Sequence, residues 1–72
     1  METKDQRFKR LASARTNKVL DTLDLIGNLS NENFYKYSEK EVQEIFEAII
    51  ESANKNKEKF NKKKRNKRRF TL

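Results

Sequence analysis

The apolar residues of this chain recur at helical intervals in two segments, which a polar connection separates. In the first segment, three- and four-residue steps place seven residues on one face, of which one is charged. These residues are Phe8, Leu11, Ala12, Arg15, Val19, Leu23 and Ile26. The spacing predicts a helix over residues 4–26, and we expect Gly27 to end it in the left-handed conformation that commonly stops helices.

The second segment opens with a helix-start signal. Ser38 and Glu41 have the spacing of a capping box, in which each side chain hydrogen-bonds to the backbone N–H of the other residue. The apolar residues that follow again share one face. They are Val42, Ile45, Phe46, Ile49, Ala53 and Phe60. The pattern predicts a helix over residues 39–60, with residues 27–37 as the connection.

These two segments predict an all-α protein. A single glycine and no proline supply few of the turn residues that sheets require. Two helices of similar length joined by a short connection favour an antiparallel two-helix hairpin over residues 1–60. Past Phe60 no apolar residue occurs until Phe70, so residues 61–72 are predicted to be a basic tail that is disordered without a partner.

Some apolar residues lie beside the predicted faces, and a two-helix hairpin cannot bury them all. Leu20, Leu25 and Ile50 are either scattered exposed residues, which are normal, or a second interface. We favour an interface, with a homodimer closing into a four-helix bundle or with a larger protein. Phe70 and Leu72 are candidates for a linear motif that fits a partner's pocket, or simply part of a frayed end.

Charge is distributed unevenly along the chain. Residues 1–18 carry six basic and two acidic side chains, residues 19–54 carry two and eight, and residues 55–72 carry ten and one. Dense blocks of like charge stay solvated unless an anionic partner meets them. Nucleic acid, DNA or RNA, is such a partner, because each neutralised phosphate releases a counterion. In a hairpin, the two basic segments would lie at one pole.

The candidate phosphate contacts belong to the tail and to the start of the first helix. They are Lys62, Lys63, Lys64, Arg65, Lys67, Arg68, Arg69, Lys4, Arg7, Lys9 and Arg10. Cations at a helix N-terminus oppose the macrodipole, at a cost of about a few tenths of a kcal/mol each, which favours a binding role for them. A solubilising tail is the alternative. For Arg15 we favour pairing with Glu47 or Glu51 of the facing helix over a phosphate contact.

The composition argues against catalysis and against a cofactor. The chain has no cysteine and no histidine, so disulfides, thiolate metal sites and the usual general base are missing. We expect neither an enzyme nor a metal site. No run of apolar residues is long enough to span a membrane, and the N-terminus lacks the apolar region of a secretory signal. A cytoplasmic protein is expected.

Four segments resemble a group of small uncharacterised proteins from bacterial plasmids, phages and integrative elements. They are ARTNKVL (14–20), LIGNLSN (25–31), YKYSEKEVQEIF (35–46) and RRFTL (68–72). The resemblance implies an accessory role in a mobile element, such as DNA handling or interference with a host system, and it carries over no functional residues.

Three functions are compatible with these observations. The first is largely sequence-independent binding of nucleic acid through its phosphates. The alternative is a protein-binding accessory or inhibitor that docks on a nucleic-acid enzyme or a ribonucleoprotein. A third possibility is a structural subunit of a ribonucleoprotein or virion that folds only on assembly.

Overall fold

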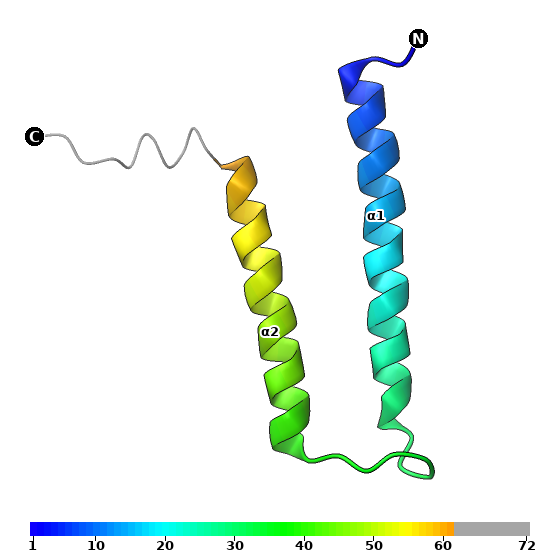
Figure 1. The fold of residues 1–72 in the computed structure, drawn as a ribbon, viewed down its shortest axis with the longest axis vertical. Coiled ribbons are helices and arrows are strands. Elements are labelled where there is room, and N and C mark those ends of the chain that lie inside the picture. The colour runs from blue at the N-terminus through cyan, green and yellow to red at the C-terminus, as the bar shows by residue number, and fades with distance from the viewer. Residues whose placement is uncertain (62–72) are drawn as a thin grey trace, which may run out of the picture. The chain divides into compact units, whose positions relative to one another are not determined.

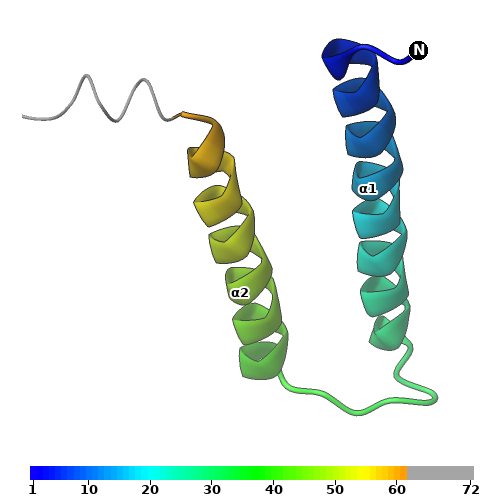
Figure 2. The same ribbon diagram turned by 45° about the horizontal axis from the view of Figure 1, so that its top comes forward.

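A computed structural model describes residues 1–61 of the chain. These residues form two α-helices, each followed by one short 3-10 turn (Figure 1). The elements are α1 (Lys4–Gly27), η1 (Asn28–Ser30), α2 (Glu39–Lys57) and η2 (Glu58–Phe60). Within this range the structure contains no strand, which confirms the all-α class predicted from the sequence. Both α-helices run without interruption, as a second view shows (Figure 2).

The chain divides into two units, Met1–Lys36 and Tyr37–Leu72. The first unit contains α1 and η1, and the second contains α2 and η2. The predicted antiparallel hairpin, the common basic pole and the four-helix dimer all depend on how such units are placed. They therefore stay predictions.

Helix α1 begins at a capping box that the sequence analysis did not identify. The Thr3 hydroxyl accepts a hydrogen bond from the backbone N–H of Gln6 at 3.0 Å. In return, the backbone N–H of Thr3 donates to Gln6 Oε1 at 3.0 Å. Asp5 places an acid in the first turn, where the positive end of the macrodipole favours it. The cap and this acid offset part of the cost of the cations at the same end.

The predicted left-handed stop at Gly27 is wrong. Gly27 has φ −59° and ψ −33°, which is ordinary right-handed helix. The backbone N–H of Asn28 donates to the carbonyl of Asp24, so the helical hydrogen bonding continues past the glycine into η1. The helix therefore does not end in a left-handed glycine cap. It tightens into a 3-10 turn instead, a common way for the last carbonyl groups to find donors.

Helix α2 begins at the capping box that the sequence predicted, which is confirmed. The backbone N–H of Glu41 donates to the Ser38 hydroxyl at 3.1 Å, and the backbone N–H of Ser38 donates to Glu41 Oε1 at 2.9 Å. At the other end, Lys55 and Lys57 lie in the last turn, where they complement the negative end of the macrodipole. The charge order of α2 thus supports its helix, in contrast to that of α1.

No side chain in residues 1–61 is fully buried. The least exposed are Leu11, Ala12, Leu23 and Ile26 on α1, and Val42 and Ile49 on α2. All six belong to the apolar faces predicted from the sequence periodicity. Because most helical stability in proteins comes from packing of an amphipathic face, a surface that covers these residues would stabilise each helix further.

Candidate nucleic-acid interface

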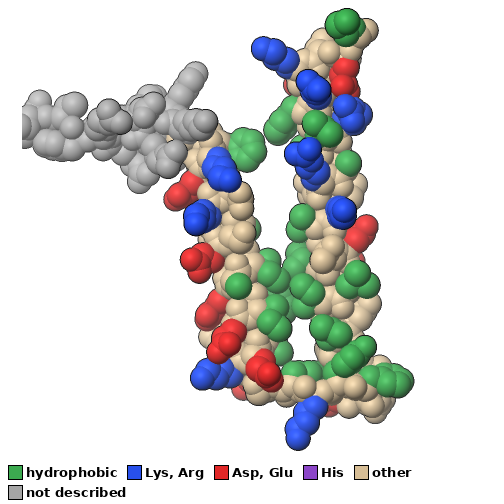
Figure 3. Space-filling model, in the orientation of Figure 1, with side chains coloured by type: hydrophobic (Ala, Val, Ile, Leu, Met, Phe, Trp, Pro, Cys, Tyr) green, Lys and Arg blue, Asp and Glu red, His purple; other side chains and the backbone are tan. Residues whose placement is uncertain are grey.

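The basic residues of the first unit gather on α1. Figure 3 shows lysine and arginine side chains along the N-terminal half of this helix, and aspartate and glutamate side chains along α2. The four predicted N-terminal contacts, Lys4, Arg7, Lys9 and Arg10, are all exposed. They are not equivalent, because the structure gives two of them acidic partners.

Lys9 is paired along the helix. Its Nζ lies 3.2 Å from Asp5 Oδ2, one turn earlier, with both side chains about 70% exposed. Pairs this open to solvent contribute little, because water and salt screen them. The pair nevertheless places a carboxylate beside Lys9, which distinguishes this lysine from Lys4 and Arg7.

Arg10 is held more firmly by Glu2. Arg10 Nε donates to Glu2 Oε2 at 2.7 Å and Arg10 Nη2 donates to Glu2 Oε1 at 3.0 Å. The hydrogen bonds from Arg10 hold the pKa of Glu2 below its usual value, and the same contact raises the pKa of Arg10. The carboxylate fills the guanidinium fork in the bidentate manner that a phosphate would use. Arg10 thus already has an anion in the unliganded protein.

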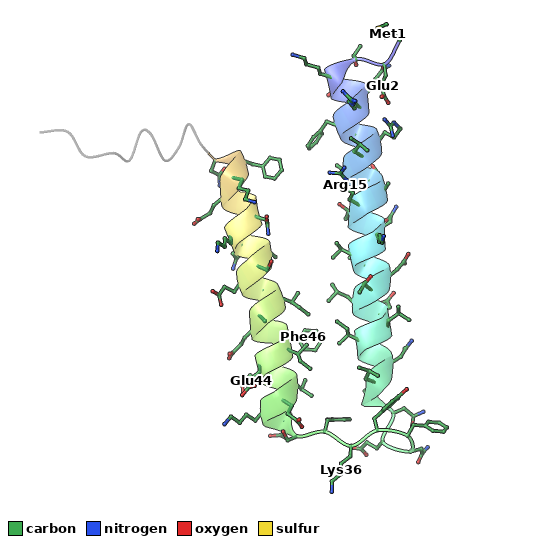
Figure 4. The ribbon with its side chains drawn as sticks, in the orientation of Figure 1. Met1, Glu2, Arg15, Lys36, Glu44 and Phe46 are labelled. Atoms are coloured by element: carbon green, nitrogen blue, oxygen red, sulfur yellow. The ribbon has the colours of Figure 1, made fainter. Side chains whose placement is uncertain are left out.

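Four other cations of α1 are in no ion pair within their unit. Two of them, Lys4 and Arg7, were predicted as contacts, whereas Arg15 and Lys18 were not among the predicted site residues. Arg15 projects from the middle of α1 (Figure 4). Its predicted pairing with Glu47 or Glu51 joins two different units and stays a prediction. Lys18 lies three residues after Arg15, the same spacing that separates Lys4 from Arg7.

The predicted tail contacts lie outside the described residues. This holds for every one of Lys62, Lys63, Lys64, Arg65, Lys67, Arg68 and Arg69, and for the apolar candidates Phe70 and Leu72. The basic segment 55–72 has three cations among the described residues. They are Lys55 and Lys57 at the end of α2 and Lys59 in η2.

Helix α2 has two chemically distinct sides. Glu44 and Phe46 leave it in opposite directions (Figure 4). Along one side of α2 lies an open depression lined by the apolar or aromatic residues Tyr37, Val42, Phe46 and Ile50 and by the polar residues Glu39, Gln43 and Glu47. Gln43 Nε2 donates to Glu47 Oε1 at 3.1 Å within this lining. The depression thus combines apolar and acidic side chains.

The three described candidates for a protein interface are strongly exposed. Leu20 is 52%, Leu25 65% and Ile50 58% accessible to solvent. Ile50 also lines the depression on α2. On a chain this small, such exposed apolar side chains are available for contact with a partner.

No group of three or more side chains in residues 1–61 has the composition and proximity to hold a metal ion. In the same range, none of the helices is both long and apolar enough to cross a membrane.

Comparison with models of protein families, with curated proteins and with solved structures found no match to this chain.

Proposed function

We propose that this protein binds nucleic acid through the phosphate backbone, largely independently of base sequence. The observation that carries the proposal is the charge of residues 55–72, where ten basic side chains stand against one acid. The tail cations named above supply most of the contacts. On α1, Lys4 and Arg7 extend them, because neither has an acidic partner in its unit, whereas Lys9 and Arg10 do.

The concentration of cations in residues 55–72 and in the first turns of α1 supports the sequence-independent form of the proposal. Base recognition uses positioned side chains such as asparagine, glutamine or arginine on a helix that is docked in a groove. Phosphate contact requires only cations within reach, and its strength falls steeply with salt. A helix start rich in cations, followed along the chain by a basic C-terminal segment, suits that second mode. An accessory role in a mobile element, implied by the sequence resemblance, is compatible with it.

The test is a salt titration of affinity with the full-length chain. Fluorescence anisotropy on a labelled 20-base-pair duplex and a 20-nucleotide single strand would be measured between 50 and 200 mM salt. Replacing the seven tail cations by glutamine should reduce the slope of log affinity against log salt by up to about 6. The control, Lys36→Gln with Lys40→Gln, removes cations outside the proposed contacts and should change the slope by less than 1. Unchanged binding after the tail replacement would overturn the proposal.

A second candidate function is favoured by the depression on α2. Its lining combines apolar residues with Glu39 and Glu47, which suits a protein partner that presents apolar and basic side chains together. The protein would then act as an accessory or inhibitor docked on a nucleic-acid enzyme or ribonucleoprotein. Affinity purification with and without nuclease separates the two functions. One protein partner retained after nuclease treatment, and lost with Phe46→Ala, supports this second function.

A further inference from the structure

The cations of α1 that lack an acidic partner are spaced in a repeating way. Lys4 and Arg7 are three residues apart, and so are Arg15 and Lys18. Eleven residues separate Lys4 from Arg15, and eleven separate Arg7 from Lys18. Eleven residues make slightly more than three full turns of an α-helix, so the second pair returns to the angular position of the first within about 20°. All four side chains are exposed on one continuous helix.

The four cations therefore share one narrow face of α1. At about 100° per residue, Lys4, Arg7, Arg15 and Lys18 fall within an arc of about 80°. We call these four residues the cation face. Lys9, which pairs with Asp5, lies about 160° around the helix from Arg7. Arg10 lies beside the face, about 60° from Arg7, and its guanidinium is occupied by Glu2.

The middle of the cation face is uncharged. Between the two cation pairs the same arc contains Leu11, which is half-buried, while Ala14 and the exposed Phe8 lie at its two margins. None of these side chains has a hydrogen-bond donor or acceptor with which to distinguish bases. Beyond Lys18 the next charged residues of α1 are Asp21 and Asp24, so the cation face ends there. The face consists of two charged ends around an apolar centre.

The distance between the pairs indicates the partner. At 1.5 Å per residue, the two pairs are about 16 Å apart along the helix axis. The major groove of B-form DNA is about 12 Å wide and the minor groove about 6 Å, so a span of about 16 Å exceeds either groove. A helix lying across a groove would bring one pair to the backbone on each side. A fixed spacing of this kind matches a rigid double helix, whereas a flexible single strand does not require it.

We infer that α1 binds the backbone of double-stranded nucleic acid on two sides of a groove, through Lys4 and Arg7 at one end and Arg15 and Lys18 at the other. The inference rests on the proposed function and adds the duplex form of the ligand and two further contact residues. It also assigns Arg15 to a phosphate, the alternative to its pairing with Glu47 or Glu51. The apolar centre offers no hydrogen bond to a base edge, which is compatible with binding that depends mainly on the phosphates.

The test moves charge without changing composition. Exchanging neighbours as Arg15→Thr with Thr16→Arg, and Asn17→Lys with Lys18→Asn, turns both cations of the second pair about 100° around the helix. Net charge and residue content stay the same. We expect the salt slope for a 20-base-pair duplex to fall by about 1.8, which corresponds to two lost phosphate contacts. Affinity for a single strand of equal length should not change, because a flexible strand can follow the displaced cations.

The matched control exchanges Lys40→Gln with Gln43→Lys, which moves one cation on α2 outside every proposed phosphate contact. It should leave the slope unchanged. Duplexes of DNA and of RNA, tested in parallel, show whether one or both present a groove that α1 spans. An exchange variant that binds both duplexes like the wild type overturns the inference. In that case the proposed function still holds if replacing the seven tail cations by glutamine weakens binding. Wild-type protein that binds no nucleic acid at all overturns both.

A second measurement uses the wild-type chain and does not depend on how the exchange variant folds. Lysine methylation, read by mass spectrometry with and without duplex, should show protection of Lys4 and Lys18 and continued reaction of Lys9. Equal protection of all three lysines would overturn the cation face. Circular dichroism of the exchange variant supplies the remaining check, since a lower melting temperature with unchanged affinity would assign Arg15 to a structural ion pair.

Discussion

Glu2 and Arg10 form a bidentate ion pair across eight positions of the chain, with Arg10 Nε 2.7 Å from Glu2 Oε2 and Arg10 Nη2 3.0 Å from Glu2 Oε1. Glu2 precedes the helix and Arg10 lies in its second turn. The pair therefore joins the segment before the cap to the body of α1. It also places a carboxylate on Arg10, one of the four cations in the N-terminal turns.

Removing this pair should loosen the start of α1 without strengthening nucleic-acid binding. In Glu2→Gln the loss of the carboxylate charge weakens the hold on Arg10, so exchange of the Arg10 Nε proton and of the first-turn amides should accelerate in NMR spectra. Glu32→Gln removes the same charge from the connecting segment and serves as the control. Affinity for a duplex should be equal in the two variants, because Arg10 lies outside the cation face. A selective gain in Glu2→Gln would show that Arg10 contacts phosphate.

The same pair predicts how acid affects the helix start. The pKa of Glu2 is lowered in the folded chain by its hydrogen bonds from Arg10, relative to an ordinary value of 4.5. A lowered folded-state pKa contributes stability that is fully present above the unfolded value and is lost as pH falls through the folded one. Protection of the first-turn amides should therefore be constant from neutral pH down to about 5 and decline below 4.5. In Glu2→Gln this decline should be absent, as amide exchange across a pH series can establish.

The two capping boxes should dominate the local stability of the helix starts. Ser38→Ala removes the hydroxyl that accepts from the Glu41 N–H, so α2 should lose about 1 kcal/mol of helix stability. The expected readout is lower helix content by circular dichroism. Ser13→Ala, in the interior of α1, is the matched control and should maintain or raise helix content, because alanine is the better helix former. Equal effects of the two substitutions would contradict the role of the cap.

The exposed apolar residues predict self-association, in keeping with the homodimer that the sequence suggests. Ile50 is 58% exposed and lies beside Phe46 in the depression of α2. We expect the full chain to sediment as a dimer at micromolar concentration and Ile50→Ser to shift it toward monomer, since the serine hydroxyl would be costly at a dry interface. Ala48→Ser, on the polar side of the same helix, should leave the distribution unchanged. A wild-type chain that sediments as a monomer would exclude the dimer.

Local sequence patterns were sufficient to predict the two helices, but not all of the side-chain contacts that the helices make. The periodicity of the apolar residues and the Ser38–Glu41 spacing predicted the helical class and the start of α2, because both depend on residues within one or two turns. Thr3 and Gln6 carry the same spacing signal, so this cap was predictable in principle. The Glu2–Arg10 pair was not, because it spans eight residues and depends on the non-helical backbone before the cap.

The candidate site was predicted in part for a similar reason. Counting charges identified the basic segments, but it treated Lys4, Arg7, Lys9 and Arg10 as alike. Whether a cation is open to a ligand depends on its acidic neighbours in three dimensions, and those divide the four into two classes. Charge alone also cannot distinguish Lys18 from other exposed lysines. Its significance depends on the eleven-residue interval and on a continuous α1, which the structure provides.

Gly27 adopts a helical conformation, and a Cβ added there would meet no atom within 4 Å beyond its chain neighbours and the backbone of its own helix. A side chain therefore fits, and Gly27→Ala should stabilise the end of α1 by about 0.5–1 kcal/mol through a smaller loss of backbone entropy. The substitution changes no charge and touches no proposed contact. Gly27→Ala therefore changes the stability of the end of α1 alone. Comparing the affinity of this variant with that of the wild type would show whether flexibility at this point affects ligand binding.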